Sequence, residues 1–335
     1  MIKFGVTSLS GLYHRYTQFG RPKHASLLLL RELAHNPEAG AQWCDRVVTQ
    51  IRMPNGTFRE THRERFRILD SLIRDIVSAR YPSEQRLLVT DCGVSSGTTS
   101  VEFYRTLVGV FPNLAFVATD LSFTAVVVKS RRSPWAIAFE RGGGELQIII
   151  GPLVLPGQGR ISIGYPLNRI ARRIACGTLV PRARSVLQRV GTDFEPECAE
   201  LTVDGYDIIV VPMLSADCLR LTQTTPQFRC ETDDLFHPTR RPAHLLRAMN
   251  VLTRHYFDDH SLRRAFRLAL ENILPGGLFV SGRSPKGKPQ ELLATIFSRE
   301  SDRLAVVSRL NGGCEEEDLI LEAAETISSA LPIGP

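Results

Sequence analysis

Two carboxylates stand at the ends of short apolar runs, at a spacing typical of a nucleotide-binding unit. The run 87–90 ends on Asp91 and opens into the small-residue segment 93–97, and a second run, 114–119, ends on Asp120. Small residues let a ligand approach the backbone closely, and an acid at a strand tip can accept two hydrogen bonds from a ribose diol. The order strand, tight turn, helix, strand, acid therefore predicts half of a nucleotide-binding α/β unit.

The glycine pattern of this turn separates two classes of cofactor. A dinucleotide site requires G-x-G-x-x-G, and its helix N-terminus receives a pyrophosphate. Here the three glycine positions hold Gly93, Ser95 and Thr98. Because two of the three glycines are missing, the turn does not predict a dinucleotide site.

The pattern that is present, D-x-G-x-S-x-G over 91–97, resembles motif I of the class I S-adenosylmethionine-dependent methyltransferases, E/D-x-G-x-G-x-G. The resemblance implies that Asp91 lies near the amino group of the methionine moiety and that Asp120 holds the ribose hydroxyls. A strand-turn-helix without a ligand is the alternative, since short glycine patterns also arise by chance. The neighbouring residues implied to contact the cofactor are Gly93, Val94, Ser95, Gly97 and Leu121.

Two later apolar runs extend the resemblance. The run over 228–236 ends in acids, where the family often contacts adenine, which implies contacts from Asp233, Asp234 and Leu235. The run over 245–252 ends near Asn250, which joins the implied cofactor-binding residues. These runs predict the third and fourth strands of the same sheet.

A helix is predicted over 259–273 from apolar residues at helical spacing, and the sequence Leu-Pro-Gly-Gly at 274–277 ends it. A strand over 278–283 follows, as the fifth strand of these methyltransferases does. The segments 118–122 and 250–257 also resemble chemotaxis-receptor (CheR-type) methyltransferases. This second likeness concerns the cofactor-binding half only.

Composition favours a globular enzyme of the cytoplasm. The chain has 335 residues, of which 43% are hydrophobic, enough for one large core and an accessory region. Its 7 cysteines include no C-x-x-C pair, which argues against a disulfide framework or a zinc knuckle. No signal peptide and no membrane-spanning run is predicted.

Residues 1–85 are expected to form a helical segment, ahead of a methyltransferase core over 86–130 and 200–328. A helix over 60–79 shows an apolar stripe, with Asp70 and several arginines on the opposite face. It is interpreted either as a helix packed at the sheet edge or as a lid over the cofactor.

Residues 131–199 are expected to form a basic insertion made of a hairpin and an amphipathic helix. Segments 135–140 and 146–150 flank three glycines, and a helix is predicted around 167–174. Residues 146–192 contain no acid but seven arginines: Arg160, Arg169, Arg172, Arg173, Arg182, Arg184 and Arg189.

Three roles remain open for the insertion. It could be a scaffold or homodimer element whose arginines are solvated or paired with Glu195, Glu197 and Glu200. It could cap a substrate carboxylate or phosphate. With the net charge of +6, it could also contact nucleic acid or an anionic membrane surface. A buried strand over 207–212 is expected to lead back to the core.

Three short apolar runs near the C-terminus, at 292–297, 303–310 and 318–321, are predicted as strands. The turn 311–313 is expected to join the last two as a hairpin. Together with the preceding segments they predict a doubly wound, Rossmann-like α/β fold with an antiparallel C-terminal hairpin.

Methyl transfer from a sulfonium requires alignment of the acceptor more than acid–base chemistry. Tyr256, Arg247 and His255 are the candidates for substrate contact, because they lie at or beyond the predicted fourth strand. His255 and His260 alone do not predict a metal site. A small-molecule or carboxylate acceptor is expected; the alternatives are an RNA or other nucleic-acid acceptor and a non-catalytic binding protein of the same fold.

Overall fold

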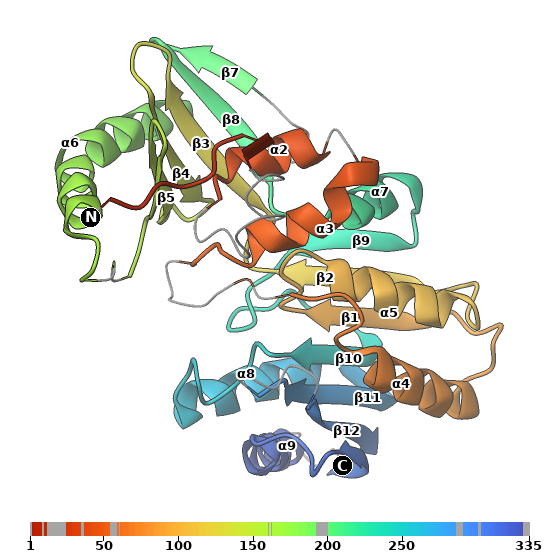
Figure 1. Ribbon diagram of the computed structural model, residues 1–335. Helices are drawn as coiled ribbons and strands as arrows, with labels where there is room; N and C mark the ends of the chain where they lie inside the picture. Colours follow the sequence, from red (N-terminus) through yellow and green to blue (C-terminus); the bar gives the residue numbers. More distant parts are fainter. Residues whose placement is uncertain are drawn as a thin grey trace. The chain divides into compact units, whose positions relative to one another are not determined.

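The computed structural model describes residues 2–8, 10–11, 25–34, 37–53, 59, 61–159, 161, 163–191, 200–285, 291–300 and 303–330, and the chain forms two compact units (Figure 1). Unit 1 comprises Met1–Thr61 and Ser122–Leu219, and unit 2 comprises His62–Leu121 and Arg220–Pro335. These divisions differ from the expected boundaries at 85, 130 and 199. The N-terminal segment is shared between the units, and the insertion begins directly after the tip of the second strand.

Unit 2 is built on a 7-stranded sheet in the order β13-β12-β11-β10-β1-β2-β9. From β9 to β11 neighbouring strands are parallel, whereas β12 is antiparallel to both β11 and β13. The chain runs outward from β1 in one direction and then outward from β10 in the other, which is a doubly wound order. The predicted Rossmann-like fold and its antiparallel end are confirmed. The strands are β1 (Leu88–Cys92), β2 (Ala115–Asp120), β9 (Phe228–Thr232), β10 (Ala243–Met249), β11 (Ile273–Arg283), β12 (Leu293–Glu300) and β13 (Arg303–Leu310).

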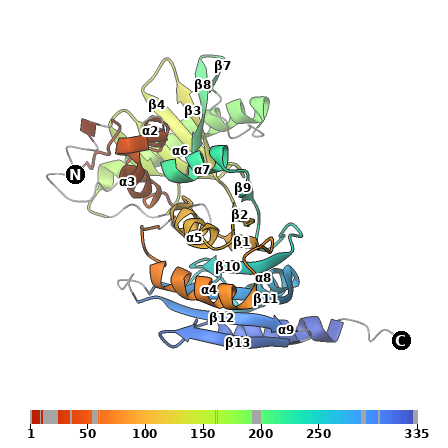
Figure 2. The ribbon, with the colours of Figure 1, turned by 90° about the vertical axis from the view of Figure 1, so that its right-hand side faces the viewer.

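Helices cover both faces of this sheet, because alternate residues of a strand point to opposite sides. In β10, Leu246 and Ala248 join a core with Phe266 of α8, whereas Arg247 between them contacts Phe103 of α5. Figure 2 shows α4 and α5 together on one side of the sheet. The helices of unit 2 are α4 (Arg67–Arg80), α5 (Thr98–Val108), α8 (Asp259–Glu271) and α9 (Glu317–Ala330).

The C-terminal element was predicted wrongly. The run 318–321 belongs to the helix α9 and not to a strand, and the turn at Asn311 and Gly312 joins β13 to that helix. The hairpin is instead formed by β12 and β13. Leu319, Ile320 and Ala323 are buried at helical spacing, a period that a window of four residues is too short to reveal.

Unit 1 contains a 6-stranded antiparallel sheet in the order β6-β5-β4-β3-β8-β7. The predicted hairpin is confirmed as β4 and β5, and the strand expected at 207–212 is β8, which belongs to this second sheet and not to the core. One face of the sheet packs on α2 and α3, and the other packs on α6. The elements are α2 (Leu28–Ala34), α3 (Pro37–Val48), β3 (Thr124–Ser130), β4 (Trp135–Glu140), β5 (Glu145–Ile150), β6 (Leu153–Pro156), α6 (Pro166–Val190), β7 (Glu200–Val203) and β8 (Tyr206–Pro212), with α7 (Ala216–Thr224) leading toward β9.

Candidate functional site

The loop between β1 and α5 lies where the strand order reverses, since β1 pairs with β10 on one side and with β2 on the other. Doubly wound folds bind ligands outside the carboxyl ends of the strands at this point. The loop backbone is left-handed at Gly93 (φ 69°), Ser95 (φ 58°) and Gly97 (φ 75°). The amides of Gly93 and Val94 both donate to the carbonyl of Thr119, at 2.7 and 3.2 Å, which ties the loop to the end of β2.

Asp120 connects this loop to the two neighbouring strand tips. Its Oδ2 accepts a hydrogen bond from the backbone amide of Ser95 at 2.7 Å, and its carbonyl accepts one from the amide of Asp233 at 3.0 Å. Leu121, the next residue, is 49% exposed. The structure therefore brings together the loop, Asp120 and the start of the Asp233 segment, as expected from the sequence.

Gly93 is required by packing as well as by backbone conformation. A Cβ added at Gly93 would lie 2.7 Å from Cβ of Val251, in the segment after β10. This contact joins the loop to the fourth strand and has no signature in the sequence. Val94 beside it is 5% exposed, so its side chain belongs to the core.

A Gly93→Ala variant is expected to lose about 2–4 kcal/mol of unfolding free energy, from the left-handed backbone and the overlap with Val251. The matched control is Gly109→Ala at the end of α5, where φ is −64° and nothing lies within 4 Å of the added Cβ. That control should change stability by less than about 0.5 kcal/mol. Urea denaturation of the two variants measures the difference, and equal stabilities would contradict the packing role of Gly93.

Asp233 and Asp234, the acids predicted to lie near adenine, make hydrogen bonds within the loop that follows β9. Oδ1 of Asp233 accepts from the amide of Thr239 at 2.9 Å, and Oδ2 pairs with Arg241 at 3.3 Å. Oδ1 of Asp234 accepts from the amide of Phe236 at 2.9 Å. Leu235 packs against the core shared by α8 and α9. Their contact with adenine stays a prediction.

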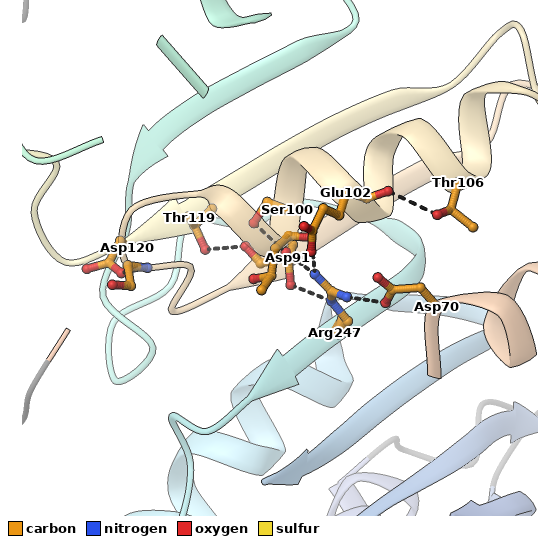
Figure 3. A network of polar contacts seen from close by, with 10 residues as sticks. Asp70, Asp91, Ser100, Glu102, Thr106, Thr119, Asp120 and Arg247 are labelled. Atoms are coloured by element: carbon orange, nitrogen blue, oxygen red, sulfur yellow. Dashed lines mark hydrogen bonds and ion pairs between the residues drawn. The ribbon is translucent and has the colours of Figure 1, made fainter. Parts of the chain in front are cut away.

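Arg247 is a core residue, and its predicted contact with a substrate is wrong. The side chain is 1% exposed, and its Nε and Nη2 donate to the two carboxylate oxygens of Asp91 at 2.8 and 2.7 Å. Its Nη1 donates to Asp70 of α4 at 2.5 Å, and its guanidinium lies 4.0 Å from the ring centre of Phe103. Figure 3 shows this network, which joins β10, β1 and α4.

The same network corrects the predicted role of Asp91. Both carboxylate oxygens accept from Arg247, and Oδ2 also accepts from the hydroxyl of Ser100 at 2.6 Å. Asp91 is 3% exposed, and its carboxylate lies on the face of the sheet that α4 and α5 cover, so it is not available to a methionine amino group. Asp70, expected on a solvated face, is 2% exposed. In Figure 3, Asp120 lies apart from Asp91, Arg247 and Asp70.

A single proton on Asp70 would make this cluster neutral. Burial raises the pKa of Asp70 from 3.8 to about 7; Arg247 opposes the shift, whereas Asp91 and Glu102 add to it. Burial alone would lower the pKa of Arg247, but the charges of Asp91 and Asp70 raise it overall. Asp70 is therefore the group of this cluster that takes up a proton as the pH falls below about 7.

Because the pKa of Asp70 is raised on folding, its contribution to stability is present below its ordinary pKa and is lost as the pH rises through about 7. The wild-type protein should therefore lose stability relative to Asp70→Asn between about pH 5 and about pH 8. Urea denaturation at both pH values checks this, with Asp75→Asn, exposed on the same helix, as the control. If the unfolding free energy of the wild type relative to Asp70→Asn increased with pH instead, Asp70 would be ionised in the folded chain.

Asn250 and Arg65 organise the ends of β10 and β11. Asn250 adopts a left-handed backbone (φ 60°), and its Oδ1 accepts from the amide of Ser284 at 2.7 Å and from Nη2 of Arg65 at 3.3 Å. Nε of Arg65 donates to the hydroxyl of Ser284 at 3.0 Å. Arg65 was not among the predicted site residues, because it falls within the helix predicted over 60–79, whereas the helix begins only at Arg67.

His255 and Tyr256 lie in the turn after β10, both exposed, with their rings 5.0 Å apart. Their contact with a substrate stays a prediction. Cys92, inside the loop motif, is buried, and burial raises the pKa of its thiol to about 12, which makes it a packing residue and not a nucleophile. Over the described residues, no three His, Cys, Asp or Glu side chains gather as metal ligands.

A groove of 620 Å³ lies elsewhere in unit 2, over β1, β2 and β9. It is lined by Leu88, Val117 and Arg229, among others, and includes neither the 93–97 loop nor Asp120. The groove lacks the left-handed loop and the positioned acid that the strand tips carry, so the strand tips are the candidate site. In the part of the chain that the structure describes, no helix is long and apolar enough to cross a membrane.

No protein-family model and no curated protein matches the sequence. Among solved structures, the chain is similar to the N-methyltransferase NodS from Bradyrhizobium japonicum WM9 in complex with S-adenosyl-L-homocysteine (12% identity, 72% of this chain, 71% of that chain, TM-score 0.31). It is also similar to the amino pentose methyltransferase CalS10 from Micromonospora echinaspora (11% identity, 77% of this chain, 81% of that chain, TM-score 0.31). A third similar structure is the [4+2]-cyclase SpnF (10% identity, 64% of this chain, 44% of that chain, TM-score 0.28). The first structures found are matched over less than half of their own length. Similarity at these TM-scores assigns neither an activity nor a substrate to this chain.

Proposed function

We propose that unit 2 binds S-adenosylmethionine and that the protein transfers its methyl group to a small-molecule or carboxylate acceptor. The observation that carries this proposal is the left-handed loop at Gly93, Ser95 and Gly97, held to the Asp120 carboxylate by the Ser95 amide at 2.7 Å. A cradle of this kind at the switch point of a doubly wound sheet fits a nucleoside. The motif around it resembles that of the class I methyltransferases.

The residues of the site fit the adenosine part of this cofactor better than its methionine part. The Asp120 carboxylate would accept hydrogen bonds from the ribose hydroxyls, with the loop backbone beneath the ribose. The segment after β9 would flank the adenine base. Asp91 does not fit its predicted role, because Arg247 and Ser100 occupy its carboxylate. The methionine end would therefore be held by other groups near the ends of β10 and β11.

When bound, S-adenosylmethionine supplies a methyl group on a sulfonium, which is already a good leaving group. The chain's task is to hold the acceptor in line and to exclude water. An acceptor with an O–H or N–H would pass its proton to His255 or to solvent. A carboxylate acceptor needs a cation to bind it instead. Because Arg247 is already paired with Asp91, our candidate for this cation is Arg65, at the ends of β10 and β11.

Calorimetric titration with S-adenosylhomocysteine tests the proposal, with NAD as the competing cofactor class. Micromolar binding of the first ligand alone would support the site and justify an acceptor screen. Binding without methyl transfer to any acceptor would favour the non-catalytic alternative. Preferential binding of NAD, or no binding by a folded protein, would overturn the proposal.

A further inference from the structure

Helix α6 of unit 1 presents aliphatic side chains to solvent. Leu167, Ile170 and Ile174 are 47%, 54% and 60% exposed, and their spacing puts them on one face of the helix. Ile163, in the turn before the helix, is 84% exposed. The opposite face, including Val186, packs against the sheet of unit 1. A contiguous exposed aliphatic row of this kind marks an interaction surface.

Arginines without a partner among the described residues accompany this row. The side chains of Arg169, Arg173 and Arg182 are exposed and make no hydrogen bond or ion pair with any described residue. The other described arginines of the segment are engaged: Arg172 with the carbonyls of Gly157 and Gly159, Arg184 with Glu145, and Arg189 with Asp204. Arg160 lies outside the described residues. No acid occurs in the sequence from 146 to 192, and these three exposed arginines add positive charge to the surface of the helix.

We propose that α6 docks on an anionic membrane surface. Ile163, Leu167, Ile170 and Ile174 would enter the boundary between headgroups and acyl chains, and the arginines would contact lipid phosphates. An exposed apolar row together with arginines on the same helix is a feature of helices that lie in the membrane interface without spanning it. The helix itself is too polar to cross a bilayer.

The charge and residue types argue against other occupants. A two-fold contact with a second copy through this row would bring together arginines that no acid of the helix compensates. Single-stranded nucleic acid is bound by cations interleaved with aromatic rings, but Ile and Leu form this row. The nearest ring in sequence, Tyr165, lies under the ammonium group of Lys3 at 5.3 Å.

Co-sedimentation of the full chain with lipid vesicles tests the proposal. We expect binding to vesicles of phosphatidylcholine with roughly 30% phosphatidylglycerol, at least about 10-fold weaker binding to phosphatidylcholine alone, and a loss of affinity with salt. Arg169→Gln/Arg173→Gln should weaken binding about 30-fold, which corresponds to about 1 kcal/mol for each arginine. Ile170→Ser/Ile174→Ser should weaken it by a similar factor, roughly 30-fold. All four side chains are exposed, so the variants should fold.

Matched controls lie in unit 2. Ile68→Ser, at 71% exposure, matches the isoleucine changes, and Arg86→Gln/Arg229→Gln matches the arginine changes, since both arginines are exposed and without a described partner. These controls should bind within about 2-fold of the parent. Equal binding to both vesicle types, or equal losses in the controls, would overturn the proposal.

Two further measurements test whether α6 binds nucleic acid or a second copy of the chain instead. An RNA oligonucleotide whose binding falls only in the arginine variants would overturn the membrane proposal in favour of nucleic acid. A dimer in sedimentation velocity that Ile170→Ser/Ile174→Ser converts to a monomer would overturn it in favour of self-association. RNA binding, sedimentation velocity and vesicle binding can all be measured without the cofactor. Their results are therefore independent of the proposed methyl transfer.

Discussion

Replacing Arg247 with methionine is expected to lower the free energy of unfolding by about 3–5 kcal/mol, because it leaves the carboxylate of Asp91 buried without its cation. Arg247 is 1% exposed and Asp91 is 3% exposed, so water cannot replace the lost partner. The network joins β10 to β1 and to α4, and its loss should weaken the whole of unit 2. Urea denaturation followed by circular dichroism measures the effect.

Arg247→Lys keeps the charge but loses the paired geometry on Asp91, and it provides a milder variant if Arg247→Met does not fold. Arg267→Met, on the exposed face of α8, is the matched control and should change stability by less than about 0.5 kcal/mol. A folded Arg247→Lys protein should bind S-adenosylhomocysteine like the parent. If Arg247→Lys had normal stability but bound the acceptor poorly, Arg247 would instead contact the substrate, as the sequence predicted.

Replacing Asp120 with alanine is expected to weaken S-adenosylhomocysteine binding by at least about 100-fold. Hydrogen bonds to a charged group contribute about 1.5–3 kcal/mol each, and this carboxylate would accept from the ribose hydroxyls. It also holds the loop through the Ser95 amide, so the variant loses both a ligand contact and a support of the cradle. Calorimetry with the purified variant measures the loss.

Asp120→Asn separates these two roles, because an amide oxygen can still accept from Ser95 but the charge is gone. We expect an intermediate loss of about 10-fold. Asp75→Ala, an exposed acid of α4 in the same unit, is the control and should bind like the parent. An unchanged affinity in Asp120→Ala would mean that the ligand binds away from the tip of β2, for example in the groove over β1, β2 and β9.

The tips of β1 and β2 could be predicted from the sequence because every signal there is local. An apolar run, an acid and a turn rich in small residues follow one another within a few positions. The doubly wound fold class followed as well, since short strands alternate with longer connections. The contact between Gly93 and Val251 could not be predicted, because the two residues are far apart in the chain and carry no complementary charge or motif.

The burial of Arg247 could have been predicted from the sequence. Arg247 stands in the middle of an apolar run that becomes a central parallel strand, and such strands are buried on both faces. A charged residue there predicts a buried partner more than a substrate contact. Asp70 carried the matching signal, since it follows Phe66 by four residues and precedes Ile73 by three, which places it on the buried stripe of α4.

The architecture of unit 1 could not be predicted from the sequence, for a different reason. Its sheet pairs β3 with β8 across about eighty residues, and both strands read as ordinary apolar runs. The hairpin of β4 and β5 was recognised because its turn is local. The second sheet could not be inferred, since nothing in β8 distinguishes a strand of the core from a strand of the insertion.

The division of the chain also determines when each unit can fold during synthesis. The chain passes between the units at 61/62, 121/122 and 219/220, so each unit is assembled from two separate stretches. Residues 1–61 emerge long before 122–219, with which they share a core, and β1 and β2 emerge long before β9 and β10. At about 5–20 residues per second, the nascent chain holds unpaired apolar strands for several seconds, which exposes it to aggregation and to chaperone binding. A minimal cofactor-binding fragment accordingly requires residues 62–121 fused to 220–335, and no truncation from either end can yield it.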